Sequence, residues 1–158
     1  MATATAPARL QRIVDLFAGA PKDLRLQALL EYSRKVPPLP PALAAHRERL
    51  EPVPECQTPF FLASEVGGDG RVALHFDVPA ESPTTRGFAG ILSAGLDGAT
   101  AEEVLATPDD FYTAMGLAEV ISSLRLRGMT AILARLKRQV RDAVEAGAQA
   151  EQPLDRSG

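Results

Sequence analysis

The chain has little of what several classes of function require. Its 158 residues include one cysteine, two histidines and no tryptophan. A single thiol cannot form an intramolecular disulfide, a cysteine-rich zinc site or a cysteine-ligated iron–sulfur cluster. Neither His46 nor His75 has a second histidine or a carboxylate at ligand spacing on a helix. We therefore expect no metal site.

Excess charge and long hydrophobic runs are also missing. The net charge is −3 with mixed signs, which gives no basic face for nucleic acid or an anionic membrane. No run approaches the ~20 apolar residues needed to cross a bilayer. Residues 1–8 have neither the basic nor the apolar region of a secretory signal. The sequence thus predicts a cytoplasmic protein that binds neither nucleic acid nor membrane and keeps its thiol reduced.

The length and the hydrophobic content of 46% fit one folded domain. We expect a flexible N-terminus at residues 1–8, the domain at residues 9–146 and a disordered tail at residues 147–158. An apolar i, i+3, i+4, i+7 pattern from Leu10 to Phe17 predicts a first helix. Pro21 suits the first position of a second helix, so the two predict a helical hairpin.

Proline dominates the next stretch of the chain. Seven of the thirteen prolines lie between Pro37 and Pro59, which excludes a central strand or a long helix there. A short helix within residues 42–50 remains compatible with this pattern. Residues 60–66 and 71–78 predict two strands joined by a glycine-rich hairpin turn. Two strands make a small sheet, so we expect a third short strand near residues 50–56.

Helical signals return in the second half of the chain. Ser82 and Pro83 resemble an N-cap and a first helical residue. Gly87 and Gly90 suggest that another backbone approaches this helix closely. Thr100 and Glu103 form a capping box, which marks the start of a helix. Thr107 and Pro108 mark the start of another short helix, which Gly116 can end.

A long amphipathic helix is expected from about Ser122. We expect its outer cations to form a solvated face: Arg135, Lys137, Arg138 and Arg141. Helices, a hairpin and more helices together predict an α+β fold, with a small antiparallel sheet packed against several helices.

Cys56 is the main candidate for chemistry. It lies between Glu55 and Gln57 and is bracketed by Pro54 and Pro59, so it is expected on a stiff loop with apolar cover from the residues that follow. Free cysteines are often only small buried hydrophobes. A reactive thiol must ionise, however, and the adjacent Glu55 opposes ionisation.

Three segments resemble the SufE family, the sulfur acceptors of iron–sulfur cluster assembly. They are residues 53–58 before a strand, residues 85–88 on a helix and residues 124–129 at the start of the final helix. The resemblance runs from about Leu10 to Val140. It implies an α+β domain similar to the iron–sulfur scaffold fold, with the cysteine on a loop tip beside the sheet.

The resemblance also implies the site and the partners. Cys56 would carry sulfur as a persulfide taken from a pyridoxal-phosphate (PLP) dependent, SufS-like cysteine desulfurase, which it would stimulate, and would pass it to an iron–sulfur scaffold complex. No cofactor would be bound, since the PLP belongs to the desulfurase. Arg125 would stabilise the thiolate or dock the partner, with binding roles for Glu55, Gln57, Thr58 and Arg127. Family members often have glycine and serine where this chain has Glu55 and Thr58.

Two alternatives come from other classes. A cysteine-dependent hydrolase or a redox-sensing thiol would need a histidine near Cys56 or an oxidation-sensitive activity. A non-catalytic module that binds the desulfurase would leave Cys56 incidental. Catalytic partners need be adjacent only in space, so the positions of His46 and His75 in the fold bear on the first alternative.

Overall fold

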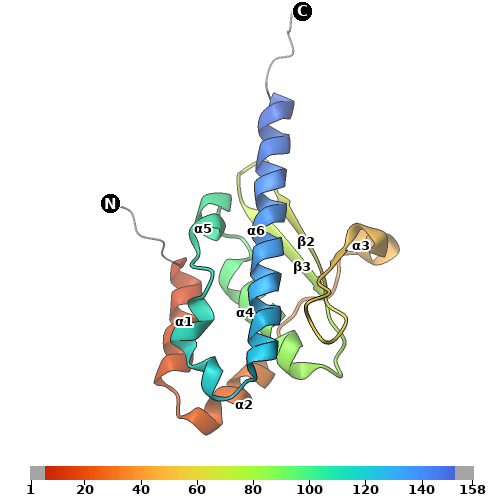
Figure 1. The fold of residues 1–158 in the computed structure, drawn as a ribbon. Helices are drawn as coiled ribbons and strands as arrows, with labels where there is room; N and C mark the ends of the chain where they lie inside the picture. Colours follow the sequence, from red (N-terminus) through yellow and green to blue (C-terminus); the bar gives the residue numbers. More distant parts are fainter. Residues whose placement is uncertain (1–5, 152–158) are drawn as a thin grey trace, which may run out of the picture.

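The computed structural model describes residues 6–151 of the chain (Figure 1). Its α-helices are α1 (Ala8–Gly19), α2 (Lys22–Ser33), α3 (Pro41–Ala45), α4 (Pro83–Leu96), α5 (Ala101–Ala106) and α6 (Ser123–Glu151). Its 3₁₀ helices are η1 (Arg47–Arg49), η2 (Phe111–Met115) and η3 (Leu117–Glu119). Its strands are β1 (Glu51–Pro52), β2 (Phe61–Val66) and β3 (Val72–Asp77).

The three strands form one antiparallel sheet in the order β1-β2-β3. The β2–β3 hairpin runs in register from Phe61 opposite Asp77 to Val66 opposite Val72. On the other edge, Glu51 pairs with Leu62. The predicted hairpin and the expected short third strand are both confirmed, and the α+β class is correct.

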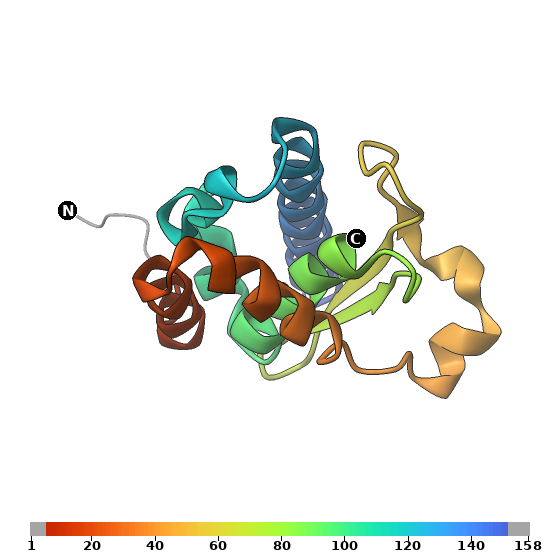
Figure 2. The same ribbon diagram turned by 90° about the horizontal axis from the view of Figure 1, so that it is seen from below.

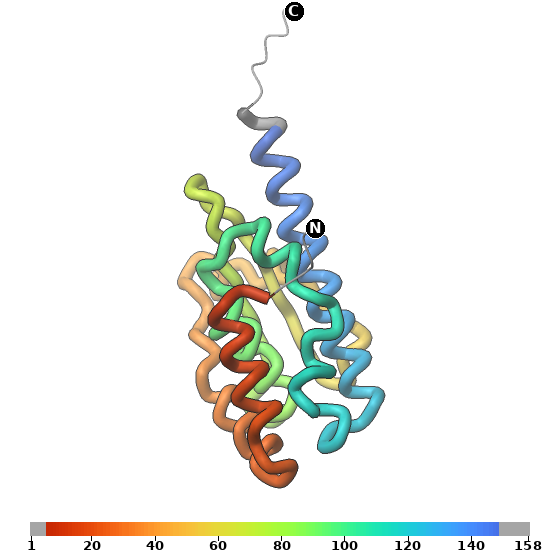
Figure 3. Tube along the Cα trace, turned by 90° about the vertical axis from the view of Figure 1, so that its left-hand side faces the viewer, coloured from red at the N-terminus to blue at the C-terminus, as the bar shows by residue number. Residues whose placement is uncertain are grey.

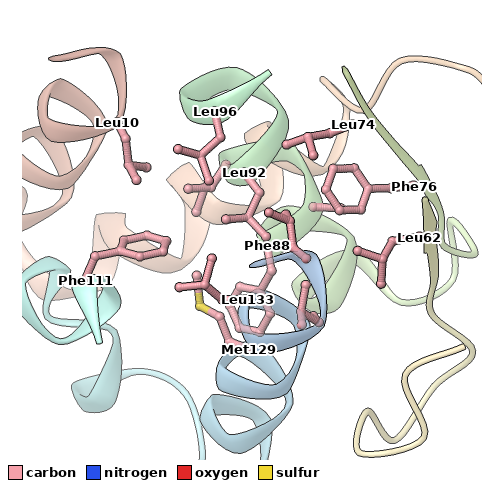
Figure 4. Packing of buried hydrophobic residues seen from close by; sticks show 14 of the residues in the cluster. Leu10, Leu62, Leu74, Phe76, Phe88, Leu92, Leu96, Phe111, Met129 and Leu133 are labelled. Carbon is pink, nitrogen blue, oxygen red and sulfur yellow. The ribbon is translucent and has the colours of Figure 1, made fainter. Parts of the chain in front are cut away.

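Helices cover one face of this sheet. Leu62, Leu74 and Phe76 are at most 5% exposed and point toward α4 and α6 (Figure 4). Strand β3 alternates buried and partly exposed residues, as expected for a sheet with one face against a core. Helices α1 and α2 pack on α4, so α4 lies between them and the sheet. Figure 2 shows this order with α6 viewed along its axis.

Two glycines allow α2 and α4 to approach each other closely. A Cβ atom at Gly90 would overlap the Tyr32 carbonyl oxygen, and one at Gly87 would lie 2.5 Å from the Leu29 carbonyl oxygen. Neither contact is sterically allowed, since non-bonded carbon and oxygen rarely come closer than about 3 Å. The predicted close approach is confirmed.

Several predicted helix boundaries hold and others shift. The capping box at Thr100 and Glu103 forms in full. The second helix begins at Lys22, so Pro21 precedes its first residue. The Ser82 side chain makes no capping hydrogen bond, although α4 does begin at Pro83. The helix expected from Thr107 and Pro108 is the 3₁₀ helix η2, which begins only at Phe111.

The C-terminal helix is longer than predicted. Helix α6 continues to Glu151 and so includes residues 147–151, which were predicted as part of the tail, and its C-terminal part extends beyond the rest of the domain (Figure 3). Residues 1–5 and 152–158, where flexibility was also predicted, lie outside the described residues. Between residues 6 and 151, no helix is both long and apolar enough to cross a membrane.

Candidate functional site

Cys56 lies at the tip of the loop that joins β1 to β2. Val53 and Phe60 anchor the base of this loop: both are buried, and the Val53 amide donates to the Phe60 carbonyl at 2.9 Å. The Cys56 amide donates to the Val53 carbonyl at 3.1 Å, which closes a tight turn. Pro54 and Pro59 limit the conformations of the segment between. The sequence thus places its one thiol on a short, restricted loop beside the sheet.

The side chain of Cys56 points at the first turns of α6. It is half-buried, and its Sγ lies 3.9 Å from the Gly128 carbonyl oxygen, which accepts its weak hydrogen bond. A Cβ atom at position 128 would lie only 3.3 Å from Sγ, so glycine lets the loop seat against the helix. A cavity of about 10 Å³ remains, lined by Cys56, Gln57, Thr85, Phe88, Leu124, Arg125 and Gly128.

This environment favours the protonated thiol. Burial raises the pKa of Cys56 from its ordinary 9.0 to about 11, the charge of Glu55 adds to the rise, and Arg135 opposes it. The Gly128 carbonyl also accepts from a thiol but repels a thiolate. While the loop packs against α6 in this way, which we call the closed position, Cys56 is a weak nucleophile, because the thiolate is the reactive form.

Charged side chains tie the same loop to α6. Arg135 donates to Glu51 at 2.7 Å and to both oxygens of Glu55 at 3.2 and 3.3 Å. Glu51 also accepts from Arg138 and, at 3.0 Å, from Gln139. Burial by itself raises the pKa of Glu51, but hydrogen bonds from these three α6 side chains outweigh it and lower the pKa overall.

The prediction that the cations of α6 form a solvated face is therefore wrong for Arg135, which is partly buried, and for Lys137, which is buried, and correct for the exposed Arg138. Arg135 and Arg138 bind carboxylates at the sheet edge and in the loop. Lys137 is 8% exposed and pairs with Asp109 at 2.6 Å. Arg141 is exposed, as predicted. Helical periodicity located these side chains but could not show that carboxylates from distant parts of the sequence face them.

The residues predicted for the site separate into two groups. Cys56, Gln57 and Arg125 line one cavity. Glu55 instead binds Arg135, while Arg127 is exposed and does not line the cavity.

The Oγ1 of Thr58, the remaining predicted residue, is buried without a hydrogen-bond partner. Sequence reasoning missed Glu51, Gly128 and Arg135 as parts of the site. The seven-residue spacing of Gly128 and Arg135 places both on one helix face, which is the signal that was available.

Neither histidine accompanies Cys56. His46 lies 3.2 Å from Glu48 and His75 lies 3.2 Å from Glu65, and the Cys56 cavity has no histidine in its lining. A cysteine–histidine arrangement is therefore not assembled here. Among residues 6–151, no group of three or more histidine, cysteine, aspartate or glutamate side chains could hold a metal ion.

Known proteins share both the sequence and the fold. The SufE family profile, described as "Fe-S metabolism associated domain", matches residues 11–140. An uncharacterised SufE-like protein of Mycobacterium tuberculosis is 53% identical over 142 residues, 90% of this chain and 98% of its own length. The cysteine desulfuration protein SufE of Plasmodium vivax is 25% identical over 132 residues, 82% of this chain and 51% of its own length.

A solved structure agrees with these matches. The solution structure of a hypothetical protein from Thermus thermophilus superimposes with a TM-score of 0.80 at 49% identity, covering 89% of this chain and 99% of that one. Fold and site together define a small α+β protein that presents one cysteine on a loop tip. The chain belongs to the SufE family, which links it to iron–sulfur metabolism.

Proposed function

We propose that this protein accepts sulfur on Cys56 from a PLP-dependent, SufS-like cysteine desulfurase and passes it to an iron–sulfur scaffold complex. The observation that carries the proposal is the position of the single thiol: a loop tip beside α6, next to a cavity that Arg125 and Gln57 line. Family membership supports the same role. The PLP would remain with the desulfurase, so the chain needs no cofactor of its own, and a reduced thiol fits a cytoplasmic location.

The transfer is a displacement at sulfur. The Cys56 thiolate attacks the outer sulfur of the persulfide on the desulfurase cysteine, forming a new S–S bond while the bond to the donor Sγ breaks. The donor cysteine leaves as a thiolate, and Cys56 carries the outer sulfur with its proton. One S–S bond replaces another, so there is no net oxidation or reduction. Unloading the donor frees it for another turnover, which accounts for stimulation of the desulfurase.

The closed position alone does not support this reaction. With a pKa of about 11, about one Cys56 in ten thousand is ionised at pH 7. Reaction therefore requires the loop to leave the Gly128 carbonyl, or a cation of the partner to approach the sulfur. Arg125 lines the cavity and is exposed, so it is placed either to stabilise the emerging thiolate or to contact the partner.

Mass spectrometry tests the proposal directly. After incubation with a cysteine desulfurase and cysteine, the protein should gain the mass of one sulfur atom on the peptide that contains Cys56, and a reductant should remove it. Cys56→Ser should gain nothing and keep its thermal stability, because the half-buried thiol makes only one weak hydrogen bond.

Two results would contradict the carrier role. One is full stimulation of the desulfurase by Cys56→Ser with transfer to a downstream acceptor, which would identify a binding module with an incidental cysteine. The other is a sulfur adduct that maps elsewhere than Cys56.

A further inference from the structure

The tip of the Cys56 loop is held mainly by side chains. Its backbone bonds lie at the base, from Val53 to Phe60, and within the turn itself. Apart from packing of Cys56 against Gly128 and the core, the polar contacts of the tip with α6 are the weak bond of the Cys56 thiol to Gly128 and the ion pair between Glu55 and Arg135. Since a thiol is a weak donor, the ion pair is the stronger of these two attachments.

The guanidinium of Arg135 connects both β1 and the Cys56 loop to α6. Arg135 directs Nη1 to Glu51 on β1 and Nη2 to Glu55 in the loop. The planar fork of arginine suits two carboxylates at once, whereas lysine offers a single point charge. The Arg135 and Glu51 side chains are 27% and 28% exposed, so water and salt screen this pairing less than a pair on the open surface.

The ion pairs of Arg135 with Glu51 and with Glu55 differ in how easily they break. Glu51 also binds Arg138 and Gln139, so it stays attached to α6 when Arg135 lets go. The Glu55 side chain is 50% exposed, and Arg135 is the ion-pair partner that the structure records for it. The Glu55–Arg135 bond can therefore open while the sheet edge remains in place.

The closed loop also carries polar groups whose hydrogen bonding is incomplete. The Nε of Arg135 and the Oγ1 of Thr58 are both buried without a hydrogen-bond partner. Buried polar groups in this condition destabilise the state that contains them. The Oγ1 of Thr58 belongs to the loop, so opening the loop would expose this group to water and offset part of the loss of the ion pair.

We propose that Arg135 is a positioning residue that latches the Cys56 loop to α6 through Glu55, and that rupture of this ion pair precedes presentation of the thiol. The latch is a property of the isolated chain. Its role in sulfur transfer rests on the proposed function. Glu55 precedes Cys56 directly, so it is the part of the latch that moves with the cysteine.

Alkylation of Cys56 by uncharged N-ethylmaleimide, at fixed pH and without any partner, tests the latch. Arg135→Gln should react about two- to fivefold faster than the wild type, the factor expected for loss of one exposed ion pair. Electrostatics alone predicts the opposite, since Arg135 lowers the pKa of Cys56 and its removal disfavours the thiolate. Arg141→Gln, the same change at an exposed position of the same helix, is the matched control and should leave the rate unchanged.

Three further readouts separate a latch from a general structural role. Glu55→Gln should also accelerate alkylation, and the double variant should react no faster than the faster single variant, because both changes open the same bond. Arg135→Lys should restore part of the protection. Raising the salt concentration from about 0.05 to about 0.5 M should accelerate the wild type but not Arg135→Gln, because salt screens the pair.

Hydrogen exchange locates the change. In Arg135→Gln, the amides of the Cys56 peptide should exchange faster while those of α1 and α4 stay as slow as in the wild type. Faster exchange throughout the domain would assign Arg135 to stability and overturn the latch, as would an unchanged or slower alkylation rate in both Arg135→Gln and Glu55→Gln. A latch that passes these tests in a protein that accepts no sulfur would refute the proposed function alone.

Discussion

The surroundings of Cys56 act in opposite directions on the pKa of its thiol. Burial and Glu55 raise its pKa, while Arg135 lowers it, and the Gly128 carbonyl accepts a hydrogen bond from the thiol but not from a thiolate. The raised pKa favours the protonated thiol, which is oxidised less readily than the thiolate. A carrier of a labile sulfur atom gains from this protection as long as the loop can open when the partner is present.

The raised pKa of Cys56 predicts a pH dependence of stability. In the unfolded chain the thiol loses its proton near its ordinary value of 9.0, and in the folded chain near 11. Between these values the unfolded state binds fewer protons, so the free energy of unfolding falls as pH rises. Cys56→Ala lacks this contribution.

Denaturant titrations of both proteins from about pH 8 to about pH 11 would measure the effect. The stability of the wild type should decline relative to Cys56→Ala across this window. If the unfolding free energies of the two proteins change in parallel with pH, burial beside Glu55 does not raise the pKa of the thiol.

At the scale of elements, the domain depends on how closely α2 and α4 approach. The two helices meet through Gly87 and Gly90, and α4 in turn contacts the sheet and α6. Phe88, Ile91 and Leu92 on α4 are at most 1% exposed. Helix α4 thus lies between α2 and the Cys56 cavity, whose lining includes Phe88.

Gly90→Ala should destabilise the domain strongly. Its Cβ atom would overlap the Tyr32 carbonyl oxygen, so α2 and α4 must separate, at a cost of about 3 kcal/mol. Gly19→Ala is the control, because nothing lies within 4 Å of a Cβ atom there. It should leave stability unchanged or raise it by up to about 1 kcal/mol. Equal stabilities of the two variants in urea would refute this packing.

At the scale of the whole molecule, the opening of the Cys56 cavity has both apolar and cationic character. Leu124 is 45% exposed, and Arg125 and Arg127 are exposed beside it at the start of α6. These two arginines carry positive charge on a chain whose net charge is −3. Such a surface is complementary to an acidic partner surface with an apolar centre.

Arg125→Ala should therefore impair the proposed sulfur transfer more than it impairs folding. We expect transfer on the order of tenfold slower at low salt, with the difference shrinking as salt screens the encounter. The unfolding free energy should change by at most about 0.5 kcal/mol, as is usual for exposed side chains. A large loss of stability with normal transfer would assign Arg125 to the structure instead.

The elements follow closely from local sequence. Apolar spacing located α1 and α6, Ser82 and Pro83 marked the start of α4, the glycine-rich turn between two short segments located β2 and β3, and the Thr100–Glu103 pair marked the start of α5. These features depend on residues within a few positions of one another, and the local backbone decides them. The ordered motifs around Cys56 and Arg125 indicated the SufE family for the same reason.

The environment of the thiol was decided only by the tertiary structure. Cys56 and Gly128 are 72 positions apart in the sequence, and the partners of Arg135 and Lys137 were invisible to a pattern that predicted a solvated face. Burial is the largest cause of the raised pKa of Cys56, and neither burial nor the opposing charge of Arg135 can be read from neighbouring residues; only the effect of the adjacent Glu55 could be expected from the sequence. The sequence by itself singled out Cys56 as the candidate reactive residue, whereas the packing of α6 against the β1–β2 loop decided how far its thiol is buried and which way its pKa shifts.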